Sequence, residues 1–206
     1  MPLRDQSLNQ IVLATRNPDK GRELGALLGG IGIRIRTLED FPSAPEVEED
    51  GTTCEANAIK KAREIARATR IPALADDTGL EVEALEGRPG VYAARYAGEH
   101  ATYEDNCRKL LLELAGVPPV NRRARFLTVA AIAFPSGDVH VTQGILNGVI
   151  SERPIGECGF GYDPVFFVPE FNKTLAQLTI EEKNRISHRA KAFTQMCTWL
   201  KERPVA

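Results

Sequence analysis

Two separate acidic segments carry the carboxylates that could hold a metal ion. Glu48 belongs to the acidic run at residues 46–50, and Asp77 belongs to the pair Asp76-Asp77, which follows a short apolar stretch. Hard cations such as Mg²⁺ are commonly held by one or two carboxylates together with substrate phosphates and water. Adjacent like charges at the end of an apolar strand repel each other unless a cation or hydrogen-bond donors compensate. This argues for a functional role of the pair, whereas the run at 46–50 is equally compatible with a solvated acidic turn.

Residues 15–20 contain the components of an anion-binding loop. An apolar stretch leads into Thr15 and Asn17, and Lys20 follows within what should be the first turn of a helix. We expect Asn17 to cap that helix and Pro18 to be its first residue, which should leave backbone N–H groups pointing outward for an anion. The segment lacks the glycines of a Walker A loop. The alternative is a capped helix with a solvated lysine.

A second set of cations lies near the C-terminal end of the sequence. Ser187 should cap a helix whose first turn contains His188 and Arg189. Positive charge is unfavourable at that end of a helix, so a ligand that carries oxygens, either a phosphate or a purine carbonyl, is expected there. The alternatives are a hydrogen-bonded structural role for His188 and a solvated helix position for Lys183.

Residues 159–163 read Gly-Phe-Gly-Tyr-Asp. Flexible glycines beside aromatic rings suit the stacking of a base next to a hydrogen-bonding carboxylate. Aromatic residues next to a strand are, however, more often part of the core. The sequence has no Gly-x-Ser-x-Gly motif, and its cysteines and three histidines show no pattern of a nucleophilic triad.

The elements expected to position these residues alternate between strands and helices in the first half of the chain. Hydrophobic spacing predicts strands at 11–14, 73–75, 80–84, 123–134, 139–150 and 165–168, with helices that begin near Pro18, Thr52, Thr102, Thr179 and Ser187. Thr52 and Glu55 match a capping box. The acidic pair would then lie at a strand end, and the turn at 135–138 would join two strands into an antiparallel hairpin. Together these elements predict a mixed α/β sheet.

Composition limits the classes of function. The chain has 206 residues, of which 43% are hydrophobic and 26% charged, so residues 1–206 can form one domain, or two closely joined lobes, with residues 1–10 as a flexible extension. A net charge of −2 provides no global field for nucleic acid or for an anionic membrane. The sequence lacks a membrane span and an N-terminal signal, which favours a cytoplasmic protein. The four cysteines are widely spaced, and we expect each to be a buried small hydrophobic residue.

Taken in order, six short motifs resemble the inosine triphosphate pyrophosphatase family over about residues 11–200. The motifs are Thr15-x-Asn17-x-x-Lys20, Asn57-Ala58-x-x-Lys61-Ala62, Asp76-Asp77-Thr78-Gly79, Ala94-Arg95-Tyr96, Gly159-Phe160-Gly161-Tyr162-Asp163-Pro164 and Ser187-His188-Arg189. The resemblance implies a long twisted mixed sheet flanked by helices, with a nucleotide cleft between two lobes, and a homodimer. It also implies Mg²⁺-dependent hydrolysis of inosine and xanthosine triphosphates and their deoxy forms (ITP, dITP, XTP and dXTP) to monophosphate and pyrophosphate.

The resemblance also implies roles for individual residues. Glu48 and Asp77 would bind the metal, and Asp77 would accept a proton. The implied substrate contacts are Thr15, Arg16, Asn17, Pro18, Asp19, Lys20, Lys61, Thr78, Phe160, Gly161, Tyr162, Asp163, Lys183, His188 and Arg189. The sequence departs from the usual family pattern at Cys54, Ala56, Ala93 and Ala97, where phenylalanine, glutamate and two serines are common.

The expected reaction is in-line attack of water on the α-phosphorus. Hydrogen-bond donors from His188 or Arg189 would suit the 6-oxo group of hypoxanthine or xanthine and oppose the 6-amino group of adenine. Three alternatives remain open. They are a pyrophosphatase for modified pyrimidine or methylated nucleotides, a non-catalytic nucleotide sensor, and a nucleic-acid-binding module, the last of which the net charge disfavours.

Overall fold

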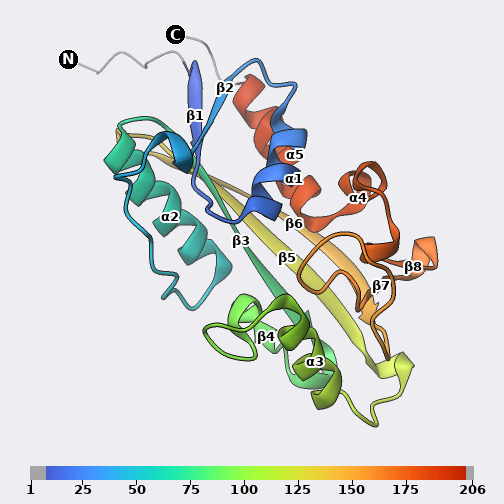
Figure 1. The fold of residues 1–206 in the computed structure, drawn as a ribbon. Coiled ribbons are helices and arrows are strands. Elements are labelled where there is room, and N and C mark those ends of the chain that lie inside the picture. Colours follow the sequence, from blue (N-terminus) through green and yellow to red (C-terminus); the bar gives the residue numbers. More distant parts are fainter. Residues whose placement is uncertain (1–7, 203–206) are drawn as a thin grey trace. The chain divides into compact units, whose positions relative to one another are not determined.

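The computed structural model describes residues 8–202 (Figure 1). The strands are β1 (Gln10–Leu13), β2 (Arg34–Thr37), β3 (Ala73–Val82), β4 (Pro89–Gly90), β5 (Arg123–Ala133), β6 (Val139–Ile150), β7 (Phe166–Val168) and β8 (Lys173–Thr174). The helices are α1 (Pro18–Leu28), α2 (Cys54–Thr69), α3 (Tyr103–Glu113), α4 (Ile180–Ile186) and α5 (His188–Glu202).

The strands form one mixed sheet, as the sequence predicts. Their order is β2-β1-β3-β5-β6-β7-β8, and β4 pairs with β3 away from this path. β1 runs parallel to both β2 and β3, whereas β6, β7 and β8 pair antiparallel in succession. The predicted turn between β5 and β6 is closed by the Phe134 N–H, which donates to the Asp138 carbonyl over 2.9 Å. The parallel pairs require crossover helices, and the chain supplies α1 and α2 for them.

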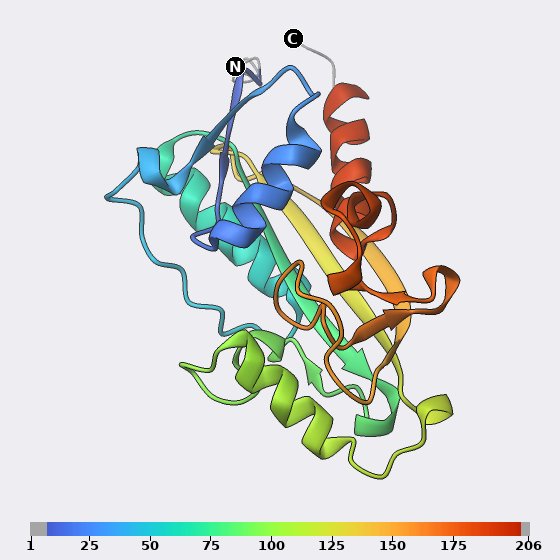
Figure 2. The ribbon, with the colours of Figure 1, turned by 45° about the vertical axis from the view of Figure 1, so that its right-hand side comes forward.

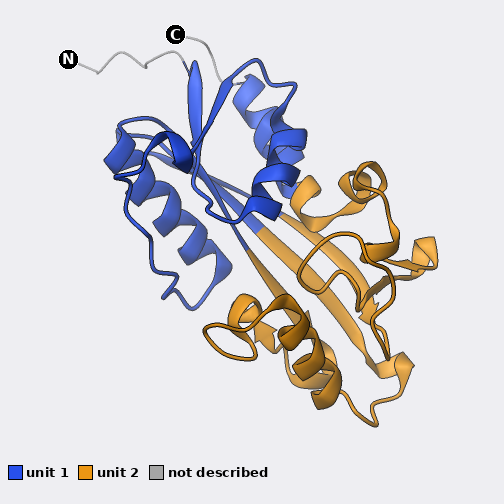
Figure 3. Cartoon of the chain, in the orientation of Figure 1, with its two compact units in different colours: residues 1–77, 129–143, 192–206 blue, residues 78–128, 144–191 orange. Residues whose placement is uncertain are grey.

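The chain divides into two compact units, coloured separately in Figure 3. Unit 1 contains residues up to Asp77 together with 129–143 and the chain from Ala192 onward, and unit 2 contains residues 78–128 and 144–191. The long strands β3, β5 and β6 contribute residues to both units. Asp77 and Thr78, neighbours in β3, are therefore the last residue of one unit and the first of the other.

In unit 1, helices cover both faces of the sheet (Figures 1 and 2). Ile11 and Leu13 of β1 point to the same face as Leu74, and this face packs against apolar side chains of α1 and α5 such as Leu24 and Phe193. The other face is covered by α2, whose buried side includes Ala58, Ala62, Ile65 and Ala66. Strands covered on both faces are apolar throughout, which explains the uninterrupted run Ile-Val-Leu in β1.

In unit 2, α3 provides much of the apolar cover. Leu110 and Cys107 of this helix join a core with Leu80 of β3, Phe126 of β5 and Phe166 of β7. The helix begins as the sequence predicts, because Thr102 and Asp105 form a capping box. A capping box formed by Thr179 and Glu182 also lies at the start of α4.

Two details of the predicted elements are wrong. β3 runs without a break from Ala73 to Val82, so Asp76 and Asp77 lie in the middle of a strand and not at its end. Parallel pairing with β1 at Ala73 and Leu74, and antiparallel pairing with β4 at Leu80 and Glu81, hold both halves of the strand in the sheet.

The second wrong detail is the start of α2. Its N-cap is Thr53, whose hydroxyl accepts from the Ala56 N–H over 3.1 Å, and not Thr52 with Glu55. The one-residue shift follows from the sequence itself, because both positions are threonine.

Burial of the cysteines differs from the prediction in part. Cys54 and Cys107 are buried, but Cys197 is only half-buried and Cys158 is exposed. Most of the predicted N-terminal extension, residues 1–10, lies outside the described residues, although Gln10 already begins β1 and the Asn9 carbonyl accepts from the Arg34 N–H. None of the helices in residues 8–202 is long and apolar enough to cross a membrane.

Candidate active site

The loop before α1 is held together by hydrogen bonds within the chain. Asn17 caps the helix as predicted, because its Oδ1 accepts from the N–H groups of Asp19 and Lys20 over 2.9 and 3.2 Å. Pro18 has no N–H, and the Gly21 N–H donates to the Asn17 carbonyl. The expectation that this helix start offers free N–H groups is therefore wrong. An anion at this loop would meet the Lys20 ammonium group in place of the backbone.

Lys20 points toward the acidic pair. Its Nζ lies 3.3 Å from Asp76 Oδ2, and its side chain is 17% exposed whereas that of Asp76 is 1% exposed. The side chains of two neighbouring residues, Arg16 and Asp19, also have partners within the chain. Arg16 donates from Nη2 to the Ala44 carbonyl over 3.0 Å, and the Asp19 carboxylate pairs with Arg22. Lys20 therefore neutralises a buried carboxylate and keeps a partly exposed charge.

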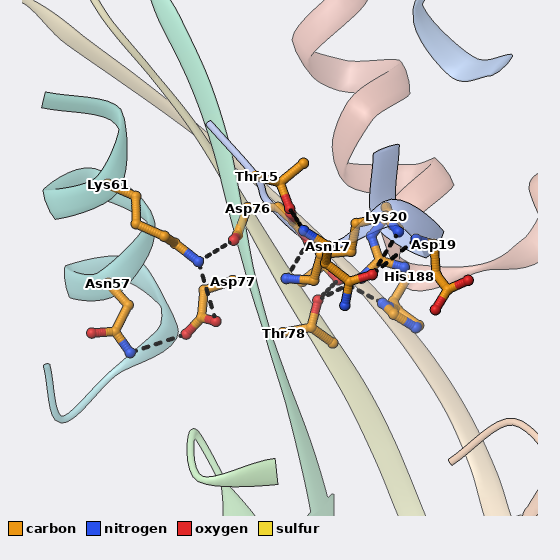
Figure 4. Close-up of polar contacts among 12 residues, drawn as sticks. Thr15, Asn17, Asp19, Lys20, Asn57, Lys61, Asp76, Asp77, Thr78 and His188 are labelled. Carbon is orange, nitrogen blue, oxygen red and sulfur yellow. Dashed lines mark hydrogen bonds and ion pairs between the residues drawn. The ribbon is translucent and has the colours of Figure 1, made fainter. Parts of the chain in front are cut away.

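Asp77 is held by two side chains from one face of α2 (Figure 4). Asn57 Nδ2 donates to Asp77 Oδ2 over 3.2 Å, and Lys61 Nζ lies 3.7 Å from Asp77 Oδ1. Residues four apart on a helix share a face, so the spacing of Asn57 and Lys61 brings both to the same carboxylate. The same ammonium group donates to the Asp76 main-chain oxygen over 2.6 Å. Both oxygens of Asp77 are thereby fixed in orientation.

The acidic run at 46–50 is linked to this cluster through Asn57 and Lys61. Asn57 Oδ1 accepts from the Gly51 N–H over 2.8 Å, and Lys61 Nζ donates to Glu49 Oε1 over 2.8 Å. The site residue predicted in this run is Glu48, which is exposed. The described contacts with Lys61 involve Glu49, a residue that sequence reasoning did not select. Glu48 and Glu49 are adjacent, so the two hydrogen bonds fix the backbone that carries both.

Burial raises the pKa of Asp77 above its ordinary value, and this effect exceeds the opposing influence of Lys61 and Lys20. Burial acts in the same direction on Glu49, but there the nearby Lys61 holds the pKa below its usual range. Cys54, at the first turn of α2, is close enough to Asp77 to be affected by its charge. Burial, followed by Asp77, raises the pKa of this thiol to about 12. Cys54 is therefore a neutral neighbour of the carboxylate.

Unit 2 contains a second polar cluster, which connects β3, β5 and the start of α5. Thr78 Oγ1 lies 2.7 Å from Thr128 Oγ1, and Thr128 Oγ1 lies 2.5 Å from His188 Nδ1. Arg189 donates from Nη2 to Thr78 Oγ1 over 3.2 Å. Three of these residues were predicted, whereas Thr128 was missed. The signal that could have identified it is a single hydroxyl-bearing residue within the apolar part of β5. The structure shows that Thr128 is fully buried there.

The loop at 159–163 is organised by Asp163. Its Oδ2 accepts from Lys183 Nζ over 2.6 Å and from the Phe160 N–H over 2.9 Å. Lys183 is buried, so the solvated alternative is wrong, and its ammonium group lies 4.8 Å from the centre of the Phe160 ring. The Arg189 guanidinium lies 5.5 Å from the same ring. Phe160 is thus flanked by two cations, both within cation–π distance of its ring.

Tyr162 follows the core alternative instead. It is buried in the apolar cluster of unit 2, and its hydroxyl donates to the Ala93 carbonyl over 2.8 Å. Gly161 has a φ of 63°, in the left-handed region that glycine adopts easily. These two residues therefore shape the loop that presents Phe160.

The predicted residues fall into two groups. Unit 1 brings together Lys20, Lys61 and Asp77, with Thr15 accepting from the Asn17 N–H over 3.2 Å, and unit 2 brings together Thr78, Phe160, Asp163, Lys183, His188 and Arg189. Within residues 8–202, no group of three or more His, Cys, Asp or Glu side chains is arranged as a metal site.

Comparison with known proteins identifies the family of the chain. A model of the Ham1 family matches residues 11–199. The dITP/XTP pyrophosphatase of Geobacter sulfurreducens is 52% identical to this chain, and the match covers 90% of this chain and 94% of that protein. The dITP/XTP pyrophosphatase of Geobacillus kaustophilus is 50% identical, and the match covers 92% of this chain and 93% of that protein. The solved structure of a HAM1 protein from Coxiella burnetii superposes with a TM-score of 0.86 at 41% identity, covering 94% of this chain and 99% of that one. The chain belongs to the Ham1 family.

Proposed function

We propose that this protein is a nucleoside triphosphate pyrophosphatase that converts ITP, dITP, XTP and dXTP to the monophosphate and pyrophosphate. The relatives named dITP/XTP pyrophosphatase support this activity, because their similarity covers nearly the whole chain. The observation that carries the proposal is the state of Asp77. It is a buried carboxylate with a raised pKa whose two oxygens are oriented by Asn57 and Lys61. Perturbed, well-oriented carboxylates of this kind are typical of acid–base groups.

The residues present fit Mg²⁺. Magnesium is usually held by one or two carboxylates plus substrate phosphates, so a site without three protein ligands agrees with its chemistry. Asp77 and Glu48 are the residues that would hold it. A bound dication would also favour the ionised form of Asp77, which burial alone disfavours. When bound, the metal would neutralise charge on the phosphates of the substrate and of the leaving pyrophosphate.

In the proposed mechanism, a water molecule attacks the α-phosphorus and passes a proton to the Asp77 carboxylate. Asn57 keeps Oδ2 in place, and Lys61 provides positive charge beside Oδ1. Lys20, which is partly exposed, is assigned to the triphosphate. Thr15, Arg16 and Asn17 lead into α1, and Pro18 and Asp19 begin the helix that carries Lys20. Because Asn17 already satisfies the first N–H groups of α1, the phosphate contact depends on side-chain charge.

The base is assigned to the cluster in unit 2. Phe160 provides an aromatic face, and His188 and Arg189 provide donors for a 6-oxo group. Lys183 and Asp163 hold the loop of Phe160, and Thr78 is bonded to Arg189. A 6-amino group is itself a hydrogen-bond donor, so it would oppose the donors of His188 and Arg189. Two opposed donors cost about 1 to 3 kcal/mol in a buried site.

The activity is tested by the products. Purified protein with Mg²⁺ and ITP should release pyrophosphate, so a malachite-green assay should detect orthophosphate only after inorganic pyrophosphatase is added. Inosine monophosphate should appear in equal amount. Orthophosphate without the added enzyme would contradict attack at the α-phosphorus, and binding of ITP without any product would indicate a nucleotide sensor.

The substrate panel should include ATP, GTP, modified pyrimidine triphosphates and methylated purine triphosphates. A preference for the last two groups would replace the proposed substrate class. A cytoplasmic location, a homodimer, and a lack of nucleic-acid and membrane partners complete the proposal. The net charge of −2 supports the lack of nucleic-acid and membrane partners, and the homodimer follows the resemblance of the motifs to the pyrophosphatase family.

A further inference from the structure

Thr128 connects the two predicted contacts of the base, Thr78 and His188, from a position in β5 where it is fully buried. Its hydroxyl is the middle of a hydrogen-bond chain that runs from Arg189 through Thr78 and Thr128 to His188 Nδ1. Thr78 and His188 are labelled in Figure 4. Removing the hydroxyl would break the chain without removing any group that we assign to the substrate.

The direction of this chain decides which nitrogen of His188 carries a proton. The guanidinium of Arg189 can only donate, so Thr78 Oγ1 accepts from it. If Thr78 then donates to Thr128, and Thr128 donates to His188, each hydroxyl gives one hydrogen bond and accepts one. His188 Nδ1 is then an acceptor, and the imidazole proton must be on Nε2.

The reverse direction would start at a proton on Nδ1 and would place two donors, Thr128 and Arg189, on the oxygen of Thr78. A cationic donor at one end polarises a chain of hydroxyl groups so that each next O–H becomes a better donor. This favours the direction that leads away from Arg189 and ends at Nδ1. The distances of 2.7 and 2.5 Å place the successive groups within hydrogen-bond reach of one another.

Stacking and burial also hold the imidazole ring of His188 in one orientation, so each ring nitrogen has a defined position. The Phe126 ring stacks on His188 with a centroid distance of 4.5 Å and an interplanar angle of 28°. Phe126 in turn contacts Phe166 of β7, again at 4.5 Å between centroids. His188 is itself only 3% exposed.

We propose that Thr128 is a positioning residue that sets His188 in the Nε2–H tautomer and thereby presents a hydrogen-bond donor to the 6-oxo group of the purine. The selectivity part of this inference rests on the function proposed above, whereas the tautomer does not. Without the Thr128 hydroxyl, this contact would no longer hold Nδ1 as an acceptor, and Nδ1 would be able to carry the proton. Nε2 would then serve part of the time as an acceptor, which suits a 6-amino group.

The first test reads the tautomer directly. Long-range ¹H–¹⁵N correlation spectra distinguish the two imidazole nitrogens, and the chain has three histidines. The other two are His100, which is exposed, and His140, which stacks on Trp199. The signals that are present in the wild-type spectrum and absent from the spectrum of His188→Gln are those of His188. We expect the Nε2–H form for wild type and for Thr128→Ser, which keeps the hydroxyl, and a mixture or the Nδ1–H form for Thr128→Val. A wild-type His188 with its proton on Nδ1, or on both nitrogens, would overturn the inference without any need for a variant.

The second test measures selectivity. The ratio of kcat/KM for ITP to kcat/KM for ATP should fall about 10-fold in Thr128→Val, because one buried donor is no longer fixed, and Thr128→Ser should restore most of it. Thr142→Val is the matched control. Thr142 is a buried threonine of unit 1 whose hydroxyl donates to the Ala192 carbonyl, and its removal should leave the ratio unchanged.

The two tests separate the failure of this inference from failure of the proposed function. Suppose that wild type hydrolyses ITP in preference to ATP and that Thr128→Val lowers kcat/KM for both substrates by the same factor. In that case Thr128 has only a structural role. If wild type shows no preference for ITP, the proposed function fails, and the spectra still decide the tautomer.

Discussion

At the scale of single residues, the two carboxylates of the acidic pair are compensated by different cations. Asp76 has Lys20 within 3.3 Å of its Oδ2, and Asp77 has Lys61 at 3.7 Å together with the amide of Asn57. Because the carboxylate of Asp76 pairs with Lys20 of α1, it is suited to anchoring that side chain. Asp77, whose pKa is raised by burial, is suited to exchanging a proton.

Asp77→Asn should lower kcat for ITP by more than about 100-fold, because the variant keeps the shape of the side chain but loses the proton acceptor and the negative charge. Asp138→Asn, in the exposed turn between β5 and β6, is the control and should keep the wild-type rate. Steady-state kinetics with a thermal melt of each variant checks this. A folded Asp77→Asn enzyme with more than a tenth of the wild-type rate would assign the proton transfer to another group.

Lys20→Ala should raise KM for ITP more than it lowers kcat, because the variant loses a charge assigned to the triphosphate. It should also reduce stability, since it removes the cation beside the buried Asp76. Lys60→Ala removes a lysine that pairs with Asp50 near the surface and should change neither quantity. An unchanged KM in Lys20→Ala would show that Lys20 serves only the carboxylate.

At the scale of elements, local signals predicted the caps well. Asn17, Thr102, Thr179 and Ser187 all cap the helices that the sequence assigned to them, Ser187 through the Ala190 N–H. A cap depends on residues two or three positions apart, so its signal is contained in the sequence. The uninterrupted strand β3 was not predicted, because Asp76 to Gly79 have turn-like composition. Pairing with β1 and β4, which are distant in sequence, overrides that preference.

The same distinction applies to the site. Short motifs identified residues of both clusters, but Glu49 and Thr128 were missed. Neither belongs to a motif, and each acquires its place only through partners far along the chain, namely Lys61 and His188. The sequence also did not show that the side chain of Asn17 would accept hydrogen bonds from the first N–H groups of α1 and leave them unavailable to an anion.

The junction between the acidic run and α2 requires a glycine. A Cβ at Gly51 would lie 2.6 Å from Asn57 Oδ1, which accepts the Gly51 N–H. Gly51→Ala should therefore destabilise the protein by about 1 to 3 kcal/mol and displace Asn57 from Asp77, which should also lower kcat. Gly25→Ala is the matched control. It lies on the exposed side of α1 with no atom within 4 Å of its Cβ, and it should be neutral or stabilising by up to about 1 kcal/mol.

Chemical denaturation of both variants, with kcat measured in parallel, checks this prediction. Equal stabilities for Gly51→Ala and Gly25→Ala would mean that the acidic run is free to move away from α2 at little cost. Lower stability with an unchanged kcat would separate the fold of the run from the orientation of Asp77.

At the scale of the whole molecule, the two polar clusters belong to different compact units, and β3 passes from one to the other at the bond between Asp77 and Thr78. The proposal assigns the triphosphate and the metal to unit 1 and the base to unit 2. Different parts of the substrate should therefore protect different segments of the chain from amide hydrogen exchange.

Mg²⁺ with pyrophosphate should slow exchange in residues 15–21 and 46–51, because the ligand carries the charge that Lys20 and the acidic run are expected to bind but has no base. Inosine alone should slow exchange in residues 159–163 and at the start of α5, where Phe160, His188 and Arg189 lie. An α,β-imido analogue of ITP with Mg²⁺, in which the bond to be cleaved is replaced, should protect all four segments. Exchange at the turn between β5 and β6, where the Gly137 N–H donates to the Phe134 carbonyl and the Phe134 N–H donates to the Asp138 carbonyl, serves as the internal control and should not change. Protection of residues 159–163 by pyrophosphate would instead place Lys183 or Arg189 on the phosphates, and the base would then have to be recognised by other residues.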